Sequence, residues 1–184
     1  MVRNFLLMAG ASILLLSACE NKDSGESTAN TDSTASTEVN VQERNKKIVM
    51  ESFDAMAKGD VDGMFKNAAP DAVDYGEGSM PPMKNQDSIK NIIKGFMAAF
   101  PDYKIIGPEF YADGNKVLVY YECTGTWKGD MMGMKATGKS FKSRDVEIFT
   151  FNDEGKVTEH RSVQNMNGMF AQLGAAAPPE APKK

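Results

Sequence analysis

Apolar residues at helical spacing open the foldable part of the chain. Between residues 41 and 56 they recur mostly at helical intervals, and Gly59-Asp60 ends the run. An amphipathic helix gathers its apolar side chains on one face in this way. Residues 61–67 predict a short second helix that ends before Pro70. We therefore expect the domain to begin with two consecutive helices.

A third helix is predicted farther along the chain. From Ile89 to Phe100 the apolar positions advance by 3, 1, 3, 1 and 3 residues, which makes one continuous stripe on a helix. Asp87 or Ser88 can cap its first turn, because a short polar side chain accepts a hydrogen bond from a free backbone N–H there. Pro101 ends the helix, since the residue before a proline disfavours the helical conformation.

From Tyr103 onward the period of the apolar positions changes to two. Residues 117–124 alternate between apolar and more polar positions, as in a strand with one buried face, and Asp113-Gly114 before them is a hairpin signal. Further elements are predicted at residues 141–151 (strand), 152–155 (turn), 156–165 (strand) and 166–173 (short helix). Helices followed by antiparallel strands predict a single α+β domain over residues 41–174.

Composition narrows the class of function. The chain has 184 residues, with 21 Lys plus Arg against 25 Asp plus Glu, so its net charge is −4. An acidic chain without a basic run is not expected to bind nucleic acid, because neutralising phosphates dominates that affinity. With 2 cysteines and 1 histidine, we expect no metal site built from these residue types.

The N-terminus has the features of a secretory signal. Arg3 precedes an apolar run at residues 5–16, which is too short to span a bilayer as a helix. The sequence Leu16-Ser17-Ala18-Cys19 then resembles the bacterial lipoprotein lipobox, in which the Cys is acylated and becomes the mature N-terminus. This resemblance implies a signal peptide at residues 1–18 and a membrane anchor on Cys19. It also implies a cell-envelope location, on the outer membrane and facing the periplasm or the surface. The alternative is an ordinary signal peptide.

Two polar segments flank the predicted domain. Residues 19–40 are rich in Ser, Thr, Asn, Asp and Glu, and we interpret them as an unstructured tether. Residues 175–184 carry three prolines and predict a second unstructured tail. If Cys19 carries lipid, Cys123 has no partner for an internal disulfide. Cys123 is then a small core residue by its place in the strand pattern.

A series of short motifs in residues 53–174 resembles the SnoaL-like polyketide cyclase (ester cyclase) family. That family belongs to the nuclear-transport-factor-2-like superfamily. Each motif is weak alone, but their order over almost the whole domain is specific. The matching motifs are Gly59-Asp60, Phe100-Pro101-Asp102-Tyr103, Gly125-Thr126-Trp127-Lys128-Gly129, Met132-Gly133, Thr137-Gly138-Lys139, Ile148-Phe149, Glu154-Gly155-Lys156-Val157 with Glu159-His160, and Gln172-Leu173-Gly174.

The resemblance implies a cone-shaped, curved antiparallel sheet wrapped around about three N-terminal helices. Such a cone encloses a deep apolar pocket for a small lipophilic molecule. The resemblance also implies chemistry without a cofactor and a homodimer formed through the outer face of the sheet.

The catalytic acids of the family are replaced in this sequence. The family's acid/base is an Asp on the last strand, three residues after an acidic residue matched by Glu159, so Ser162 stands at its position. A second family Asp falls on Asn165. Ser and Asn can hydrogen-bond a carbonyl group, but neither titrates near neutral pH. The resemblance therefore implies the fold but not the usual cyclase mechanism.

A substitute proton-transfer pair is available on the predicted last two strands. His160 shares a strand face with Ser162. If that strand lies beside residues 145–151, Glu147 can reach the imidazole and orient it. Asp145 is a further candidate acid on the same strand. The structural alternatives are a buried polar His and a solvated carboxylate.

Aromatic residues supply candidate pocket walls, and ordinary core packing is the alternative for each. Methionines near residues 80–83 and 131–134 predict a Met-lined apolar pocket, with a copper site as the less favoured interpretation. The aromatic wall candidates are Tyr75, Phe100, Tyr121 and Trp127.

Two main function classes remain: a lipid-anchored binding module, and a cofactor-independent cyclase, isomerase or hydrolase that uses His160 with Glu147. A protein-interaction platform is the third.

Overall fold

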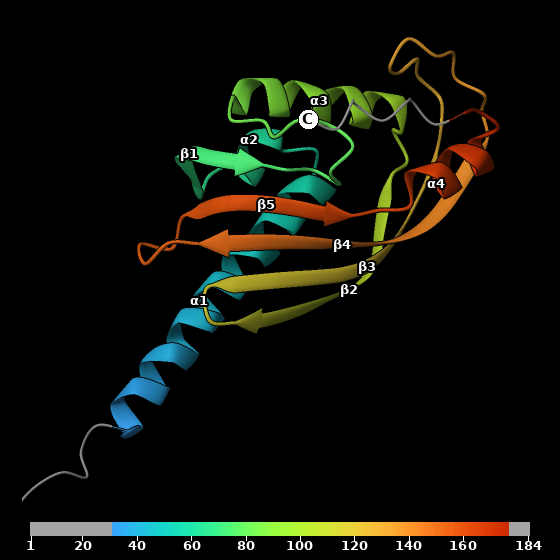
Figure 1. Cartoon of the computed structure of the whole chain (residues 1–184). Helices are drawn as coiled ribbons and strands as arrows, with labels where there is room; N and C mark the ends of the chain where they lie inside the picture. Colours follow the sequence, from blue (N-terminus) through green and yellow to red (C-terminus); the bar gives the residue numbers. More distant parts are fainter. Residues whose placement is uncertain (1–30, 177–184) are drawn as a thin grey trace, which may run out of the picture.

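The computed structural model describes residues 31–176, so the signal peptide predicted at residues 1–18, Cys19 and residues 177–184 lie outside the described part. Helices come first and most of the strands follow them, as the sequence predicts (Figure 1). The elements are α1 (Thr31–Ala57), α2 (Val61–Met64), β1 (Ala68–Asp74), α3 (Gln86–Ala99), β2 (Lys104–Asp113), β3 (Lys116–Thr126), β4 (Ser140–Phe151), β5 (Val157–Val163) and α4 (Met166–Leu173).

The five strands form one sheet in the order β1-β5-β4-β3-β2. The pairs from β2 to β5 are antiparallel, as expected. The prediction of a wholly antiparallel sheet is wrong at one edge, because β1 runs parallel to β5. The sequence gives little sign of β1, since Ala, Pro and Asp are weak strand formers. Its strand geometry comes from pairing with β5 rather than from local preference.

The predicted alternation of residues 117–124 is confirmed in β3. Val117, Val119, Tyr121 and Cys123 are buried on the inner face of the sheet. Leu118 and the other alternate side chains of β3 face outward. At the β2–β3 hairpin Gly114 adopts a φ of 53°, a left-handed conformation that glycine reaches without strain.

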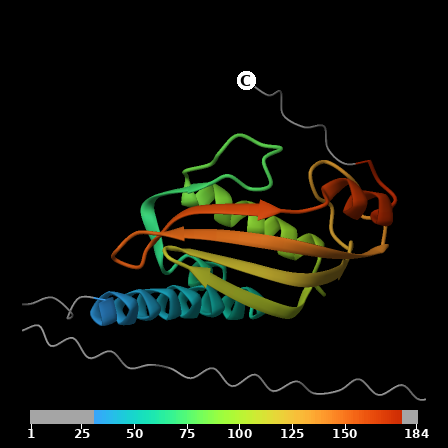
Figure 2. The same ribbon diagram turned by 60° about the horizontal axis from the view of Figure 1, so that its bottom comes forward.

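Helix α1 packs on the inner face of the sheet through Phe53. The Phe53 ring makes edge-to-face contacts with Phe110 on β2, Tyr121 on β3 and Phe149 on β4. Helix α3 packs near the other end of the strands, where Phe96 contacts Tyr103. The helices thus cover one face of the curved sheet (Figure 2). This two-layer arrangement is the expected α+β class.

Two helix starts differ from the sequence pattern. Helix α1 begins at Thr31, so residues 31–40 of the expected tether are helical, and Figures 1 and 2 show this part projecting beyond the sheet. That segment contains neither Gly nor Pro, and a helix satisfies its own backbone hydrogen bonds without packing. Helix α3 is capped by Asn85, whose side chain accepts a hydrogen bond from the N–H of Ser88, and not by Asp87 or Ser88. Within residues 31–176, no helix combines the length and apolar character needed to cross a bilayer.

Candidate functional site

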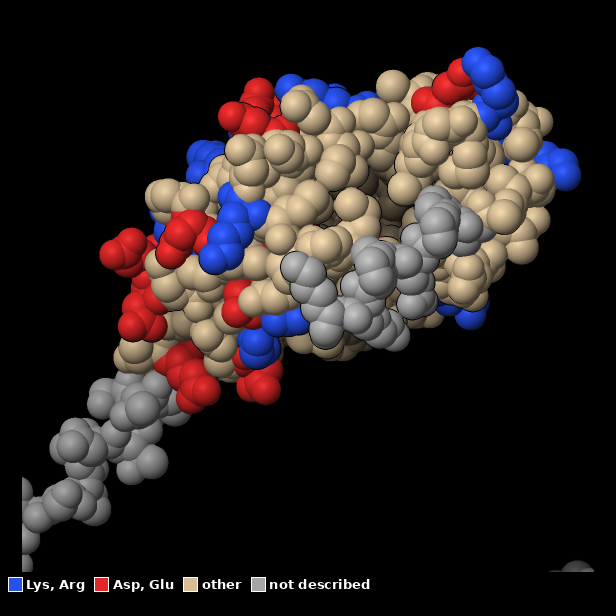
Figure 3. All heavy atoms as spheres, turned by 45° about the horizontal axis from the view of Figure 1, so that its top comes forward, with Lys and Arg blue, Asp and Glu red and all other residues tan. Residues whose placement is uncertain are grey.

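A cavity of about 1440 Å³ lies between the helices and the inner face of the sheet. Its walls are largely apolar and aromatic, and they include Phe53, Phe65, Phe96 and Phe149. In Figure 3 the molecule is hollowed within a surface of mostly uncharged residues. Methionines also line the cavity, Met131 among them, in agreement with the predicted Met-lined pocket. A cavity of this size and character suits a small ligand with a large apolar part.

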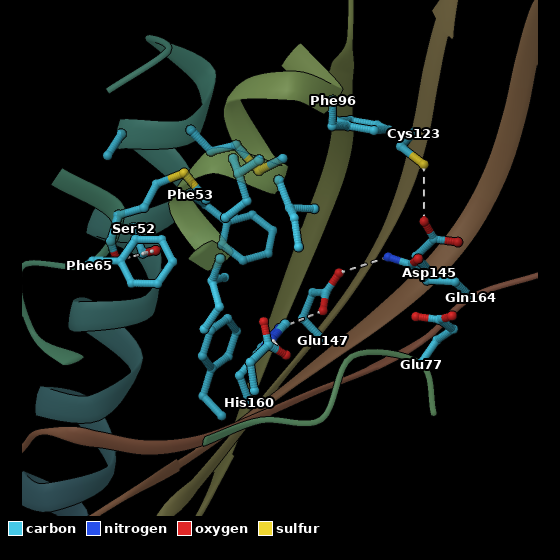
Figure 4. Close-up of a pocket in the computed structure, with 18 of the residues that line it drawn as sticks. Ser52, Phe53, Phe65, Glu77, Phe96, Cys123, Asp145, Glu147, His160 and Gln164 are labelled. Carbon is cyan, nitrogen blue, oxygen red and sulfur yellow. Dashed lines mark hydrogen bonds and ion pairs between the residues drawn. The ribbon is translucent and has the colours of Figure 1, made fainter. Parts of the chain in front are cut away.

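His160 and Glu147 lie together in this cavity, as the strand pattern predicts. Glu147 is buried on β4, and His160 follows on the neighbouring strand β5. The distance from His160 Nε2 to Glu147 Oε2 is 2.8 Å (Figure 4). The inner faces of β4 and β5 therefore place a carboxylate and an imidazole in direct contact.

A second carboxylate holds the other side of the imidazole. Asp74 is the last residue of β1, next to His160 in the parallel β1–β5 register. Its Oδ1 lies 3.0 Å from His160 Nδ1 and also accepts the Gly76 N–H at 2.8 Å. The imidazole is thus clamped between two acids, with both of its nitrogens occupied.

The second oxygen of Glu147 is also hydrogen-bonded. The Tyr121 hydroxyl donates to Glu147 Oε1 at 2.8 Å, and the Gln164 amide donates to the same atom at 3.4 Å. Burial and the negative charge of Glu147 raise the pKa of Tyr121, which keeps it protonated as a donor. These contacts fix Glu147 against the wall of the cavity.

The two acids set the protonation state of His160. Burial alone lowers the pKa of the imidazole, but the hydrogen bonds and charges of Asp74 and Glu147 outweigh burial and raise this pKa to about 10. Burial likewise opposes ionisation of Asp74, but contact with His160 and the Gly76 N–H lowers the pKa of that carboxyl. At neutral pH the imidazole is therefore a cation that can donate a proton but cannot accept one.

Asp145 forms a separate polar centre two residues before Glu147. The Ser143 hydroxyl donates to its Oδ1 at 2.7 Å, and the Cys123 thiol donates to its Oδ2 at 3.3 Å (Figure 4). Burial raises the pKa of Asp145, and the charge of Glu147 adds to this effect. Burial and the Asp145 carboxylate raise the pKa of Cys123 to about 12, so the thiol is not an activated nucleophile.

The remaining predicted site residues divide between the cavity and the core. Tyr121, Asp145 and Asn165 line the cavity, although the Asn165 side chain is also the N-cap of α4 and accepts the Gly168 N–H. Ser162 faces Glu147 in the strand register but does not line the cavity. The two positions that carry a carboxylate in the family, Ser162 and Asn165, therefore supply no acid to the cavity.

Three aromatic residues expected as pocket walls lie elsewhere. Trp127 and Phe100 are fully buried and stack on each other in the core, where the Trp127 indole N–H donates to the Gly129 carbonyl. Tyr75 lies outside the cavity lining, with the Arg161 guanidinium 3.7 Å from its ring centre. The alternative of core packing therefore applies to Trp127 and Phe100.

Sequence reasoning missed several residues of the site. Asp74 was missed because β1 was not predicted, and only its place after the short apolar pair Ala72-Val73 hints at a strand end. Gln164 comes directly after β5, and strand alternation over residues 156–165 predicts that it shares a face with His160, but its hydrogen bond to Glu147 was not predicted. Within residues 31–176, no cluster of three or more His, Cys, Asp or Glu side chains is arranged to hold a metal ion.

Comparison with known families decides the classification. The profile of the SnoaL-like polyketide cyclase family matches residues 47–173. The chain belongs to this family. The match covers α3, α4, all five strands and the second part of α1, so the whole cavity of this SnoaL-like domain lies inside it. No curated protein is significantly similar to the sequence.

Solved structures with the same fold agree with this classification. AclR from Streptomyces galilaeus, a proposed hydroxylase, is 30% identical with a TM-score of 0.63, over 72% of this chain and 97% of AclR. A proposed SnoaL-like polyketide cyclase from Jannaschia sp. CCS1 is 20% identical with a TM-score of 0.67, over 84% and 100%. An NTF2-like protein from Burkholderia xenovorans LB400 is 23% identical with a TM-score of 0.59, over 72% and 97%. The SnoaL-like domain therefore has the NTF2-like fold.

Proposed function

We propose that this SnoaL-like protein binds a small apolar or amphipathic molecule in its cavity. The observation that carries the proposal is the cavity of about 1440 Å³, with aromatic and methionine walls and a few fixed polar groups. Ligand sites combine these two features, because apolar area supplies affinity and a few polar groups fix orientation. The family acid positions hold Ser162 and Asn165 instead of carboxylates, which favours binding over the usual cyclisation chemistry.

Native mass spectrometry of the full chain tests this proposal. The protein is released from its host membranes with a polymer instead of a detergent, since a detergent can occupy an apolar cavity. We expect a small-molecule adduct that leaves on denaturation. Ile93 lines the cavity, so the larger side chain in Ile93→Trp should fill part of the cavity, and we expect this variant to carry no adduct. Ile106 is exposed on β2, so the Ile106→Trp variant should keep the adduct. An adduct that survives Ile93→Trp, or none in the native protein, contradicts the proposal.

A second candidate is a cofactor-independent cyclase, isomerase or hydrolase. The contact between His160 and Glu147 favours it. In this candidate a substrate oxygen displaces Glu147 from His160 Nε2, and the imidazolium then donates a proton to the developing oxyanion. Assays with esters, epoxides and β-keto compounds test it. Turnover that is lost in His160→Gln supports the enzyme, and no turnover with any substrate class counts against it.

Membrane attachment through Cys19 is a further part of the proposed function. Its support is the lipobox-like sequence Leu16-Ser17-Ala18-Cys19. Labelling of growing cells with an alkyne-tagged palmitate tests it. Cys19→Ser is expected to abolish labelling and release the protein from the membrane fraction, whereas Cys123→Ser is the matched control that keeps both. Protease treatment of intact cells then separates a periplasmic from a surface-facing location.

We also propose a homodimer formed through the outer face of the sheet. Its support is a group of exposed apolar side chains on that face, with Leu118 and Tyr120 on β3, Tyr111 on β2 and Val163 on β5. Light scattering after gel filtration tests it. Leu118→Glu is expected to give a monomer, while Lys116→Glu, at the hairpin end of the same strand, leaves the dimer intact. A native monomer overturns this part of the proposal.

A further inference from the structure

Most of the charged groups that face the cavity near β5 are acids. Asp74, Glu77, Asp145 and Glu147 all line it, and His160 is the cationic group among them. Lys58 and Lys66 also line the cavity, but neither forms an ion pair with any of these four carboxylates in the described part of the chain.

The positive charge of His160 is already paired with two carboxylates. Its Nδ1 lies 3.0 Å from Asp74 and its Nε2 lies 2.8 Å from Glu147, so neither nitrogen is left for a third acid. Glu77 accepts a hydrogen bond from the neutral Ser79 hydroxyl. Across residues 31–176, no Lys, Arg or His forms an ion pair with Glu77 or Asp145.

Asp145 is buried, with 7% of the residue exposed. Its hydrogen-bond donors are the neutral groups of Ser143 and Cys123. A buried carboxylate without a cationic partner is costly, and its pKa rises in response. A cation that enters the cavity would remove this cost.

Aromatic rings line the cavity beside these acids, Phe53 from helix α1 and Tyr121 and Phe149 from the sheet. Phe53 contacts Tyr121 and Phe149 edge to face, with ring centres 5.5 Å and 6.5 Å apart, and all three rings line the cavity. Figure 4 shows Phe53 on the helix side and Asp145 on the sheet side. Aromatic faces attract organic cations through their quadrupole, most strongly where water is excluded.

From this arrangement we infer that the cavity selects a protonated organic amine with an apolar body. The ammonium group pairs with Asp145, and the apolar body lies among the aromatic and methionine walls. This inference rests on the proposed binding function and adds the class of ligand. An acidic ligand in the same position is disfavoured, because its carboxylate would lie beside Asp145 and the positive charge of His160 is already paired with Asp74 and Glu147.

Isothermal titration of the full chain with three matched probes tests the inference. The probes are 2-naphthylmethylamine, 2-naphthylmethanol and 2-naphthoic acid, which share one apolar body and differ in charge. At pH 7.5 we expect the amine to bind about tenfold more tightly than the alcohol, and the acid to bind weakest. Asp145→Asn is expected to bring the amine to the affinity of the alcohol while leaving the alcohol unchanged.

Asp130→Asn is the matched control variant. Asp130 also lines the cavity, but Lys135 already neutralises it, so the preference for the amine should persist. If Asp145→Asn does not fold, the native protein supplies the second test. The preference for the amine is then expected to shrink as the pH falls and Asp145 becomes protonated, while the amine itself stays charged.

The outcomes separate this inference from the function on which it rests. Binding of the alcohol without preference for the amine overturns the inference and leaves the binding function intact. A preference for the amine that survives Asp145→Asn, or that does not change with pH, overturns the assignment of Asp145 as its partner. If none of the three probes binds, the proposed binding function fails together with the inference.

Discussion

Glu147 and His160 meet along a diagonal between β4 and β5. In the strand register Glu147 faces Ser162 and Phe149 faces His160, yet His160 Nε2 lies 2.8 Å from Glu147 Oε2. Diagonal neighbours on one sheet face are within reach of long side chains. The contact therefore depends on strand register, because a slip of one residue would turn a side chain to the opposite face.

Replacing Glu147 by Gln is expected to lower the pKa of His160 and to destabilise the fold by about 3 kcal/mol. The variant removes one of the two acids that hold the imidazolium, while the burial of the imidazole remains. Urea unfolding measures the free energy. NMR titration of the only His in the chain measures its pKa without assignment.

Glu159→Gln is the matched control for that experiment. Glu159 pairs with Arg161 at a solvent-exposed site, so its loss should cost less than about 0.5 kcal/mol. An unchanged His160 pKa in Glu147→Gln would show that Glu147 does not hold the imidazolium.

The free energy of unfolding is expected to fall as the pH rises from 6.5 to 8.5. The pKa of His160 is raised to about 10 in the folded protein, against about 6.5 in the unfolded chain. In this window the unfolded chain releases the His proton while the folded protein keeps it. The stability contributed by His160 is thus complete below pH 6.5 and lost as the pH approaches 10, with a slope of up to about 1.4 kcal/mol per pH unit.

Urea unfolding at several pH values checks this slope. His160→Gln should flatten it between pH 6.5 and 8.5, because the chain has no other His. An equal slope in the variant would assign the pH dependence to other groups.

Trp127→Phe is expected to reduce stability by about 2 kcal/mol without weakening ligand binding. The indole is fully buried, donates a hydrogen bond to the Gly129 carbonyl at 2.7 Å and packs against Phe170, but it does not line the cavity. Thermal unfolding and titration with 2-naphthylmethanol measure the two effects. Tyr111→Phe, at an exposed position, is the control with no expected change in stability. A loss of affinity without a loss of stability would place Trp127 in the site.

Two glycine-to-alanine substitutions should change the free energy of unfolding in opposite directions. A Cβ on Gly129 would lie 2.8 Å from the Ala98 carbonyl oxygen, so Gly129→Ala forces backbone to move and should cost about 1–3 kcal/mol. A Cβ on Gly95 in α3 meets nothing within 4 Å, so Gly95→Ala should stabilise by about 0.5–1 kcal/mol. Chemical unfolding of both variants checks this, and a stabilising Gly129→Ala would refute the close approach of the 126–130 segment to α3.

Most of the fold could be predicted from local pattern. The steps of the apolar stripe from Ile89 onward predicted α3, and the alternation through Tyr121 predicted β3, because helix and strand periods are properties of neighbouring residues. The contact of His160 with Glu147 followed from the same strand alternation, once β4 and β5 were expected to be neighbours. The β1 strand did not follow, since its pairing partner β5 lies far along the chain.

The sequence by itself determined the α+β class, the antiparallel strands β2 to β5 and the shared inner face of Glu147 and His160. Tertiary structure decided the parallel placement of β1. This placement brings Asp74 to the His160 imidazole, and the contact raises the pKa of the imidazole so that it stays protonated. Tertiary structure also decided that Trp127 packs in the core while Cys123 and Asp145 meet at the cavity wall. Periodicity is encoded within a few residues, whereas burial and charge pairing depend on which distant segments meet.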